Sequence, residues 1–372
     1  MSSFRAVRFA AVIGLLAVAC GSAPHAVSTT PTPSPASPTP TATASPAQLG
    51  LCAAPSNLCL ALVTLRGSNA YVVRDITDMS HPRTVSNLGM IGFGPYPSAR
   101  SQFVSATELS YVSGIGIVRM PLSGTPKSTV AEAPLVAGFR WNPDGQTAAY
   151  LTQMSRSKSE LHLVTGGLDR IAGSIPGLPD VFGCESQACA DTWDFVFGYS
   201  PDGRFISWAQ NITDIFRIWT ADGNDVTPRV TTLPFMTVWS GSGLYFRDSK
   251  GVEVYRNGAV SAFLPGIAWM FPDASAGGNE IVYEARDAKG VAHVFVVNTS
   301  TAKIRELGAG RADPVFMSSR FVWYRGERLC TSTDSCSGAS TYTGKTYIYD
   351  LQDGTETESI ITGVYDVWPH AG

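Results

Sequence analysis

The chain contains 372 residues, with 27 Lys and Arg against 30 Asp and Glu and a net charge of −3. This mild acidity excludes the electrostatic footprint of a protein that binds nucleic acid or an anionic lipid surface. Beyond its first fifty residues the chain is dominated by aromatics, Val, Ile and Gly. Its length there would hold one large all-β domain or two average ones.

Residues 1–19 have the three-part layout of a secretory signal peptide. Two arginines give a basic start, and Phe9–Val18 is an uncharged apolar run too short to span a bilayer as a stable helix. The closing Ala17-Val18-Ala19-Cys20 resembles the lipobox of bacterial lipoproteins, although Ala17 stands where Leu is usual. The resemblance implies cleavage before Cys20, diacylation of its thiol and a lipid anchor in a bacterial membrane. The alternative is an ordinary signal peptide followed by a chance cysteine.

Residues 20–50 are predicted to form a tether. Between Ser22 and Gln48 there is almost nothing but Pro, Thr, Ser and Ala, with no Lys, Arg, Asp or Glu. Such a chain cannot bury enough apolar surface to offset the entropy lost on ordering, and its prolines favour extended conformations. We therefore expect a disordered spacer that lifts a folded domain, residues 51–372, away from the membrane.

Six cysteines remain once Cys20 is assigned to the lipid, and they fall into close pairs. An even number in an extracytoplasmic protein indicates disulfides. Three local bridges are the most economical of the fifteen possible connectivities, and each would close only a short loop. The spacings are wider than those of paired zinc ligands, so no metal site is expected. The predicted pairs are Cys52 with Cys59, Cys184 with Cys189, and Cys330 with Cys336.

Two segments of the folded part nearly copy each other. Phe139–Leu151 and Phe197–Ala209 each have the pattern strand, turn, strand. Their turns are Pro143-Asp144-Gly145 and Pro201-Asp202-Gly203, in which Pro presets φ, Asp bonds the local backbone and Gly accepts a positive φ. Weaker copies begin near Phe103, Trp239, Trp269 and Asp313. Third and fourth strands follow, and four strands recurring every few tens of residues predict a β-propeller.

The Pro-Asp-Gly units resemble the TolB-like, or PD40-type, WD40-like repeats of bacterial β-propellers. The resemblance implies an all-β fold, a single propeller of four-stranded antiparallel blades, and another envelope protein as partner. Counting favours seven blades and leaves six open. The chain enters at Leu60–Leu65 as a second strand, whereas Val364–Pro369 looks like a first strand with nothing after it. The C-terminal strand is therefore expected to complete the first blade and to remove both free edges.

Large aromatics recur on the innermost strands, and we interpret them as packing between blades rather than as a ligand platform. They are Trp141, Tyr199, Trp239, Phe271, Phe316 and Trp368. Function in repeat folds lies in the loops that differ. Three segments break the repeat, namely Met90–Arg100, Pro179–Thr192 and Arg328–Lys345, the last of which carries Tyr342. The two that contain cysteine pairs would be ordered in advance, which lowers the entropic cost of binding. The alternative is that the bridges only protect long exposed loops of a secreted protein from proteolysis.

No catalytic or cofactor motif was found: the five histidines are scattered and there is no G-x-S-x-G elbow. The sequence therefore favours a non-enzymatic protein-binding or scaffold module of the cell envelope, without cofactor or nucleic acid. Two alternatives stay open. One is an extracellular propeller enzyme of the glycan lyase, glycan hydrolase or lactonase type, and the other is a glycan or small-molecule sensor. The oligomeric state is not determined by the sequence.

Overall fold

The computed structural model describes a set of ranges that all belong to one compact unit, Ala44–Gly372. The described residues are 58–68, 70–79, 81–89, 101–113, 116–133, 136–155, 158–176, 195–210, 215–230, 235–241, 243–275, 277–331 and 340–369. The predicted signal peptide, Cys20 and the tether lie outside them. Within these ranges there is no helix with the length and apolar character needed to cross a membrane.

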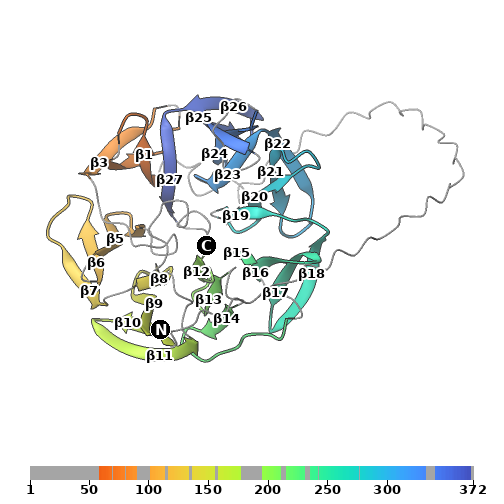
Figure 1. Ribbon diagram of the computed structural model, residues 1–372. Helices are drawn as coiled ribbons and strands as arrows, with labels where there is room; N and C mark the ends of the chain where they lie inside the picture. The colour runs from red at the N-terminus through yellow and green to blue at the C-terminus, as the bar shows by residue number, and fades with distance from the viewer. Residues whose placement is uncertain are drawn as a thin grey trace, which may run out of the picture. The chain divides into compact units, whose positions relative to one another are not determined.

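The strands form seven antiparallel sheets, which are the blades of a ring (Figure 1). From the innermost strand outward, blade 1 has β27 (Ile361–Trp368), β1 (Leu60–Leu65), β2 (Tyr71–Asp75) and β3 (Arg83–Gly89), and blade 2 has β4 (Gln102–Ser105), β5 (Glu108–Ser113), β6 (Gly116–Pro121) and β7 (Ser128–Glu132). Blade 3 has β8 (Val136–Trp141), β9 (Thr147–Ser155), β10 (Lys158–Thr165) and β11 (Leu168–Pro176), and blade 4 has β12 (Phe195–Tyr199), β13 (Phe205–Gln210) and β14 (Ile215–Thr220).

The remaining three blades lie in the second half of the chain. Blade 5 has β15 (Phe235–Ser240), β16 (Gly243–Asp248), β17 (Gly251–Arg256) and β18 (Ala259–Pro265). Blade 6 has β19 (Met270–Ala274), β20 (Glu280–Arg286), β21 (Ala292–Asn298) and β22 (Ile304–Ala309), and blade 7 has β23 (Arg311–Phe316), β24 (Phe321–Leu329), β25 (Ser340–Asp350) and β26 (Thr355–Ser359). The seven-bladed, all-β propeller expected from the repeats is confirmed.

The repeated turns fold as their residues predict. Gly145 and Gly203 adopt φ values of 68° and 69°, and each amide donates a 2.8 Å hydrogen bond across its turn, to the carbonyls of Asn142 and Ser200. A side chain at Gly203 would also collide with Asn142 of the neighbouring turn, because a Cβ there would lie 2.5 Å from its Oδ1. The glycine therefore serves both the turn and the close approach of blades 3 and 4.

The core consists of apolar layers between neighbouring blades. Alternate strand residues point to opposite faces, so each blade contributes apolar side chains to both of its neighbours. One cluster of this kind joins blades 3 and 4 through Phe139, Tyr150 and Trp208. Fully buried aromatics dominate these layers, as expected for surfaces that must each bury much area. They include Trp208, Trp219, Trp269, Trp323, Tyr245 and Tyr283.

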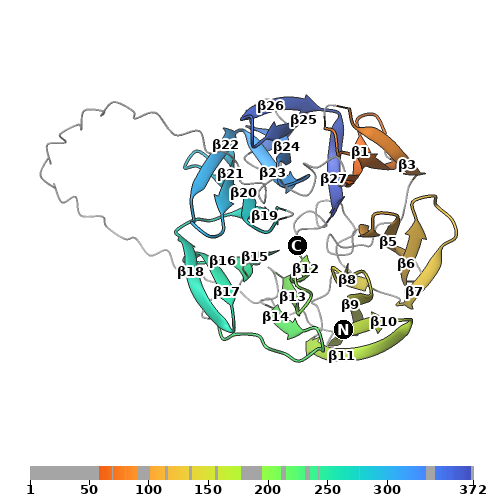
Figure 2. The same cartoon turned by 180° about the vertical axis from the view of Figure 1, so that it is seen from behind.

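The ring closes through the C-terminal strand, as predicted. β27 pairs antiparallel with β1, with Leu60 opposite Trp368 and Val63 opposite Val364, and both views place these strands side by side (Figures 1 and 2). Trp368, interpreted from the repeat as buried between blades, is so only in part. Its side chain is only half-buried and packs against the edge of the core shared by blades 1 and 2.

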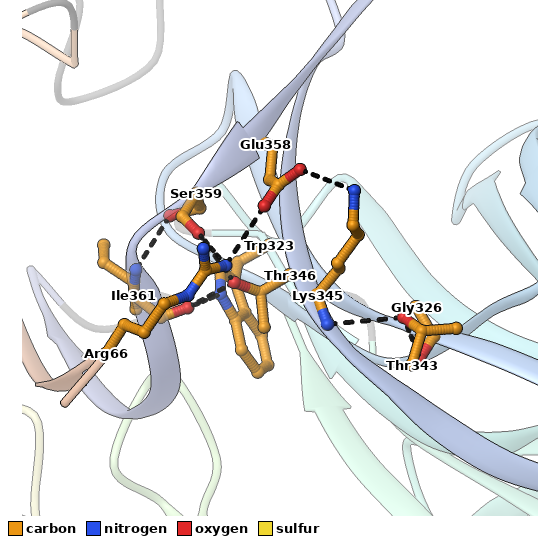
Figure 3. A network of polar contacts seen from close by, with 9 residues as sticks. All are labelled: Arg66, Trp323, Gly326, Thr343, Lys345, Thr346, Glu358, Ser359 and Ile361. Atoms are coloured by element: carbon orange, nitrogen blue, oxygen red, sulfur yellow. Dashed lines mark hydrogen bonds and ion pairs between the residues drawn. The ribbon is translucent and has the colours of Figure 1, made fainter.

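Polar contacts reinforce the joint between blade 7 and the closing strand (Figure 3). The Ile361 carbonyl accepts a 3.0 Å hydrogen bond from Trp323 Nε1 and a 2.6 Å hydrogen bond from Thr346 Oγ1. Nearby, the Glu358 carboxylate lies 3.2 Å from Arg66 Nη2 and 3.1 Å from Lys345 Nζ. The exposed ion pairs add little, so the buried bonds to Ile361 are the main polar link.

Blade 4 departs from the expected four strands, since its described part has three. Beyond β14 the chain makes a turn at Asp222–Asp225, as its Gly- and Asn-containing sequence predicts, and then one isolated bridge between Trp219 and Asp225. The Thr227 hydroxyl accepts a 2.9 Å hydrogen bond from the Ile218 amide. A side chain therefore satisfies an edge amide that a fourth strand satisfies elsewhere.

Candidate functional site

Three innermost strands carry the same backbone irregularity. In blades 5, 6 and 7, Met236, Phe271 and Asp313 have φ values of 50°, 47° and 51°. Each lies at a register shift between the first and second strand of its blade. Positive φ is unfavourable for residues with a side chain, and bulges of this kind redirect a side chain. Strain repeated at one end of three adjacent blades marks that end as a candidate site.

A charged residue accompanies each of these bulges. It lies on the second strand, opposite the residue that precedes the bulged position. The pairs are Arg247 with Phe235, Glu284 with Met270, and Arg325 with Ala312. Blades 5 to 7 therefore present the charge order plus, minus, plus at one level of the ring.

Glu284 is the most deeply placed of these charges. Its side chain has no exposed surface, and its Oε2 accepts a 3.2 Å hydrogen bond from the backbone amide of Asp313. Its Oε1 lies 2.9 Å from Arg286 Nη2, yet it accepts no hydrogen bond from the described residues. Burial raises the pKa of Glu284 to about 7, against the opposing effect of Arg286.

Arg286 connects Glu284 to blade 7. Its Nη1 and Nη2 donate hydrogen bonds of 2.8 and 3.1 Å to the two carboxylate oxygens of Glu327. Nη1 also lies 3.3 Å from Ser340 Oγ on β25. The Glu327 contacts raise the pKa of Arg286, so this guanidinium stays charged. Two-point pairing of this kind fixes orientation as well as charge.

Asp313 connects the buried charges to the surface. Its Oδ2 accepts a 2.7 Å hydrogen bond from the Tyr342 hydroxyl and lies 3.4 Å from Arg325 Nη1. The Arg325 guanidinium is 5.2 Å from the centre of the Tyr342 ring and 5.8 Å from that of Trp323. Burial and the neighbouring Asp313 raise the pKa of Tyr342. We call Glu284, Arg286, Asp313, Arg325, Glu327 and Tyr342 the blade 6–7 cluster.

Large apolar groups are exposed around this cluster. Tyr342 is 51% exposed, Leu329 37% and Phe271 36%. Tyr342 and Leu329 lie where β24 ends and β25 begins. There Glu327 pairs with Tyr342, and Leu329 pairs with Ser340. Phe271 is the bulged residue next to Met270, which lies opposite Glu284. The cluster therefore has a charged, paired interior and an apolar rim.

The innermost strands carry a second set of charged and polar groups, which connect the blades. Side-chain oxygens on one innermost strand accept hydrogen bonds from backbone amides of the next. Asp366 accepts from Phe103 at 2.5 Å, Gln102 from Trp141 at 3.3 Å, and Asp273 from Phe316 at 2.7 Å. Burial raises the pKa of Asp273 to about 6, and Arg140 lowers it only in part. Asp273 and Asp366 therefore have a structural role in joining neighbouring blades.

Most of the residues singled out from the sequence as sites lie outside the described residues. This applies to Cys20 and to four of the six paired cysteines. Cys59 and Cys330 are described, and each is disulfide-bonded. Their predicted partners, and the whole of the 184–189 pair, are not described, so the pairing remains a prediction. The lipid anchor likewise remains a prediction.

The inner-strand aromatics and the three predicted loops have mixed outcomes. Phe316, Trp141 and Tyr199 are buried in the core as interpreted, Trp239 and Trp368 are half-buried, and Phe271 is exposed. The loop expected at Arg328–Lys345 is wrong at its two ends, because residues 328–329 and 340–345 continue β24 and β25. Residues 90–100 and 177–194 fall outside the described ranges.

No group of described His, Cys, Asp and Glu side chains could hold a metal ion. The His162 ring lies 2.9 Å from Asp169 and 3.5 Å from Glu160. His293 is placed in the same way, 2.7 Å from Glu306 and 3.7 Å from Asp287. Both imidazoles therefore have carboxylate partners within their own surroundings.

Most of the cluster was not found by sequence reasoning, although Tyr342 was named with its segment and Asp313 as part of a repeat. One signal could have found Glu284 and Arg325. In blades 5 to 7 the second strand has two apolar or aromatic residues, then an aromatic residue, then a charged residue. The three copies are Leu244-Tyr245-Phe246-Arg247, Ile281-Val282-Tyr283-Glu284 and Val322-Trp323-Tyr324-Arg325.

No family model matches the chain, and no curated protein matches it. Solved structures do. The chain is a seven-bladed β-propeller. An oligogalacturonate lyase in complex with manganese shares 10% identity and a TM-score of 0.50, covering 81% of this chain and 83% of that one. A prolyl endopeptidase shares 11% identity and a TM-score of 0.52, and the match covers 81% of this chain and 50% of that one. TolB from Acinetobacter baumannii shares 13% identity and a TM-score of 0.42, and the match covers 82% of this chain and 80% of that one.

These likenesses show the fold alone. They include two TolB proteins. They also include structures named for two different enzymes, and one fold hosts many functions. The function of this propeller must therefore be argued from its own surface.

Proposed function

We propose that the protein is a lipid-anchored, extracytoplasmic propeller that binds another envelope protein without catalysis, through the blade 6–7 cluster and its apolar rim. The observation that carries this proposal is the state of Tyr342. Its ring is half exposed, while its hydroxyl is fixed by Asp313 and its face by Arg325. An exposed aromatic that is already held in one orientation loses little entropy when a partner covers it.

The surroundings of Tyr342 also suit a protein interface. Tyr and Arg are enriched among the residues that contribute most to binding, and they act best when surrounded by groups that exclude water. Phe271 and Leu329 supply such apolar surface next to the cluster. Because the carboxylates beneath are each paired or hydrogen-bonded, covering them would leave no isolated charge behind.

Localisation supports a partner in the envelope. The lipobox-like Ala17–Cys20 and the uncharged tether would place the propeller outside the cytoplasm and at a membrane. One acyl chain gives only marginal binding, so a diacylated cysteine is required for firm anchoring. The proposal therefore concerns a partner reached within the length of the tether.

Site-specific photo-crosslinking in intact cells tests the proposal. A photoreactive amino acid at Tyr342 or Phe271 should give one recurrent crosslinked protein. The same group at Val85, which is 50% exposed on β3 of blade 1, should not give that product. A shared pattern at all three positions, or no protein product at the first two, would reject the blade 6–7 cluster as a binding face.

A further inference from the structure

The cluster contains a buried acid one hydrogen bond away from the surface. Glu284 contacts the Asp313 amide at 3.2 Å, and Asp313 in turn holds the exposed Tyr342 at 2.7 Å. Asp313 also has a left-handed backbone, with φ of 51°. A change in the charge of Glu284 therefore acts directly on Asp313, the residue that orients Tyr342.

The groups that face Glu284 come from every strand packed around it. They are Arg286 on its own strand, Met270 on β19, Asp313 on β23, Glu327 on β24 and Tyr342 on β25. On β21 the nearest titratable side chain is His293, which lies with Glu306 and Asp287 instead.

The net charge of the cluster depends on one proton. With all groups ionised, three carboxylates (Glu284, Asp313 and Glu327) face the two guanidinium groups of Arg286 and Arg325, which leaves one excess negative charge. With Glu284 protonated, the cluster is neutral. The excess charge lies in a desolvated place, where electrostatic interactions are stronger than in water.

We propose that Glu284 is a proton-dependent regulator of this binding face: its ionisation as pH rises favours a partner that presents a cationic Lys or Arg side chain next to Asp313 and Tyr342. This rests on the proposed function of the face. A cation there joins the Arg325 guanidinium, which already lies 3.4 Å from Asp313 and over the Tyr342 ring, and it offsets the excess negative charge that ionised Glu284 leaves in the cluster. The raised pKa of Glu284, about 7, places the change near neutral pH.

The first test needs no partner. Carboxyl-carbon NMR of the folded protein labelled at Glu should show Glu284 titrating with a midpoint near 7, assigned by its loss in Glu284→Gln. That variant keeps the shape of the side chain and mimics the protonated state. A Glu284 midpoint near the ordinary value of 4.5 overturns the proposal.

The second test uses N-acetylarginine amide as the probe, followed through the Asp313 and Tyr342 amide signals. We expect about fivefold tighter binding at pH 8 than at pH 6, a size typical of coupling between sites. Glu284→Gln should bind equally at both values, whereas Glu132→Gln, an exposed change on β7, and His293→Gln should keep the dependence. N-acetylglutamine amide should show none.

The outcomes separate the two proposals. A pH dependence that survives in Glu284→Gln, or binding by the neutral probe to the same extent, overturns the regulation by Glu284. Absence of a crosslinked protein at Tyr342 overturns the protein-binding function, because the titration and the probe do not depend on a protein partner.

Discussion

Leu60, the first residue of β1, lies directly opposite Trp368, the last residue of β27. The two ends of the described chain are therefore neighbours in one sheet. β27 completes blade 1 and packs its other face towards blade 7, where Ile361 and Val364 join the core that contains Trp323 and Met317.

Removal of the closing strand should unfold the whole ring. Deleting residues 364–372 exposes the edges of β1 and of the blade 7 core together, and the lost packing is a large part of the net stability of a typical domain. Limited proteolysis should show no protected fragment. Deleting only residues 370–372 is the control and should leave the protein resistant. A stable N-terminal half in the longer deletion would contradict a closed ring.

Trp323→Phe should weaken the same joint without breaking it. The substitution removes the hydrogen bond from Nε1 to the Ile361 carbonyl and part of a fully buried ring, which together cost about 2–3 kcal/mol. Urea denaturation of the folded domain measures this change. Thr346 still donates to the same carbonyl, so a loss much larger than this would mean that the joint has no second polar link. Val85→Ala, on an exposed outer strand, should change the stability by less than about 0.5 kcal/mol.

Asp273→Asn should stabilise the protein at high pH only. Because the folded pKa of about 6 lies above the ordinary value of 3.8, the native state holds a proton that the unfolded state releases between these values. The wild type therefore loses stability as pH rises through 6. Asn keeps an acceptor for the Phe316 amide and removes this loss, by up to about 3 kcal/mol at pH 8.

Denaturation midpoints at pH 4, 6 and 8 measure this effect. The advantage of Asp273→Asn should grow between pH 4 and pH 8. The exposed turn substitution Asp222→Asn serves as the control and should show no such trend. An equal effect of Asp273→Asn at all three pH values would mean that its carboxyl ionises normally in the folded protein.

The fold could be predicted from the sequence because similar local sequence patterns recur along the chain, one for each blade. Pro-Asp-Gly turns mark blades 3 and 4, and alternating apolar strands at a similar spacing mark the others. The incomplete first and last units leave one way to close the ring. The structure differs from the prediction in two places where local contacts depart from the repeat. In blade 4 the Thr227 hydroxyl replaces part of a strand, and at Arg328–Lys345 the strand pairing continues into what looked like a loop.

The site was harder to predict because it depends on register. Whether Glu284 lies under Asp313 is decided by a bulge that adds one residue to the inner strand, and no local propensity marks that position. The partly buried pairing of Arg286 with Glu327 joins residues of different blades. Tyr342 was named beforehand because it lies in a segment that departs from the repeat, and Asp313 was named only as the start of a repeat unit; the hydrogen bond between them was not foreseen.

The cysteine pairs can be tested by peptide mapping without reduction. Local disulfides 52–59, 184–189 and 330–336 should appear, and Cys59 and Cys330 should be recovered in oxidised form. A bridge between two of these pairs would contradict the assignment. Reducing the 184–189 bridge should loosen its loop more than it lowers the midpoint of unfolding, because a short ring restricts the unfolded chain little.

Fatty-acid labelling tests the anchor. Cys20→Ser should lose the label and release the protein or leave it unprocessed, because its thiol is the predicted acylation site. Ser22→Ala, two residues further along, is the matched control and should be labelled and retained. Label that persists in Cys20→Ser would show that the lipid is attached elsewhere.

The place of β1 within blade 1 has a mechanical consequence. The chain enters the propeller at a strand that is flanked on one side by β27 and on the other by β2, not at an edge. Any tension transmitted along the preceding segment must therefore break hydrogen bonds on both sides of β1 before the strand can leave the sheet. The domain should resist being pulled from its N-terminal end better than a propeller whose first strand lies at the outer rim.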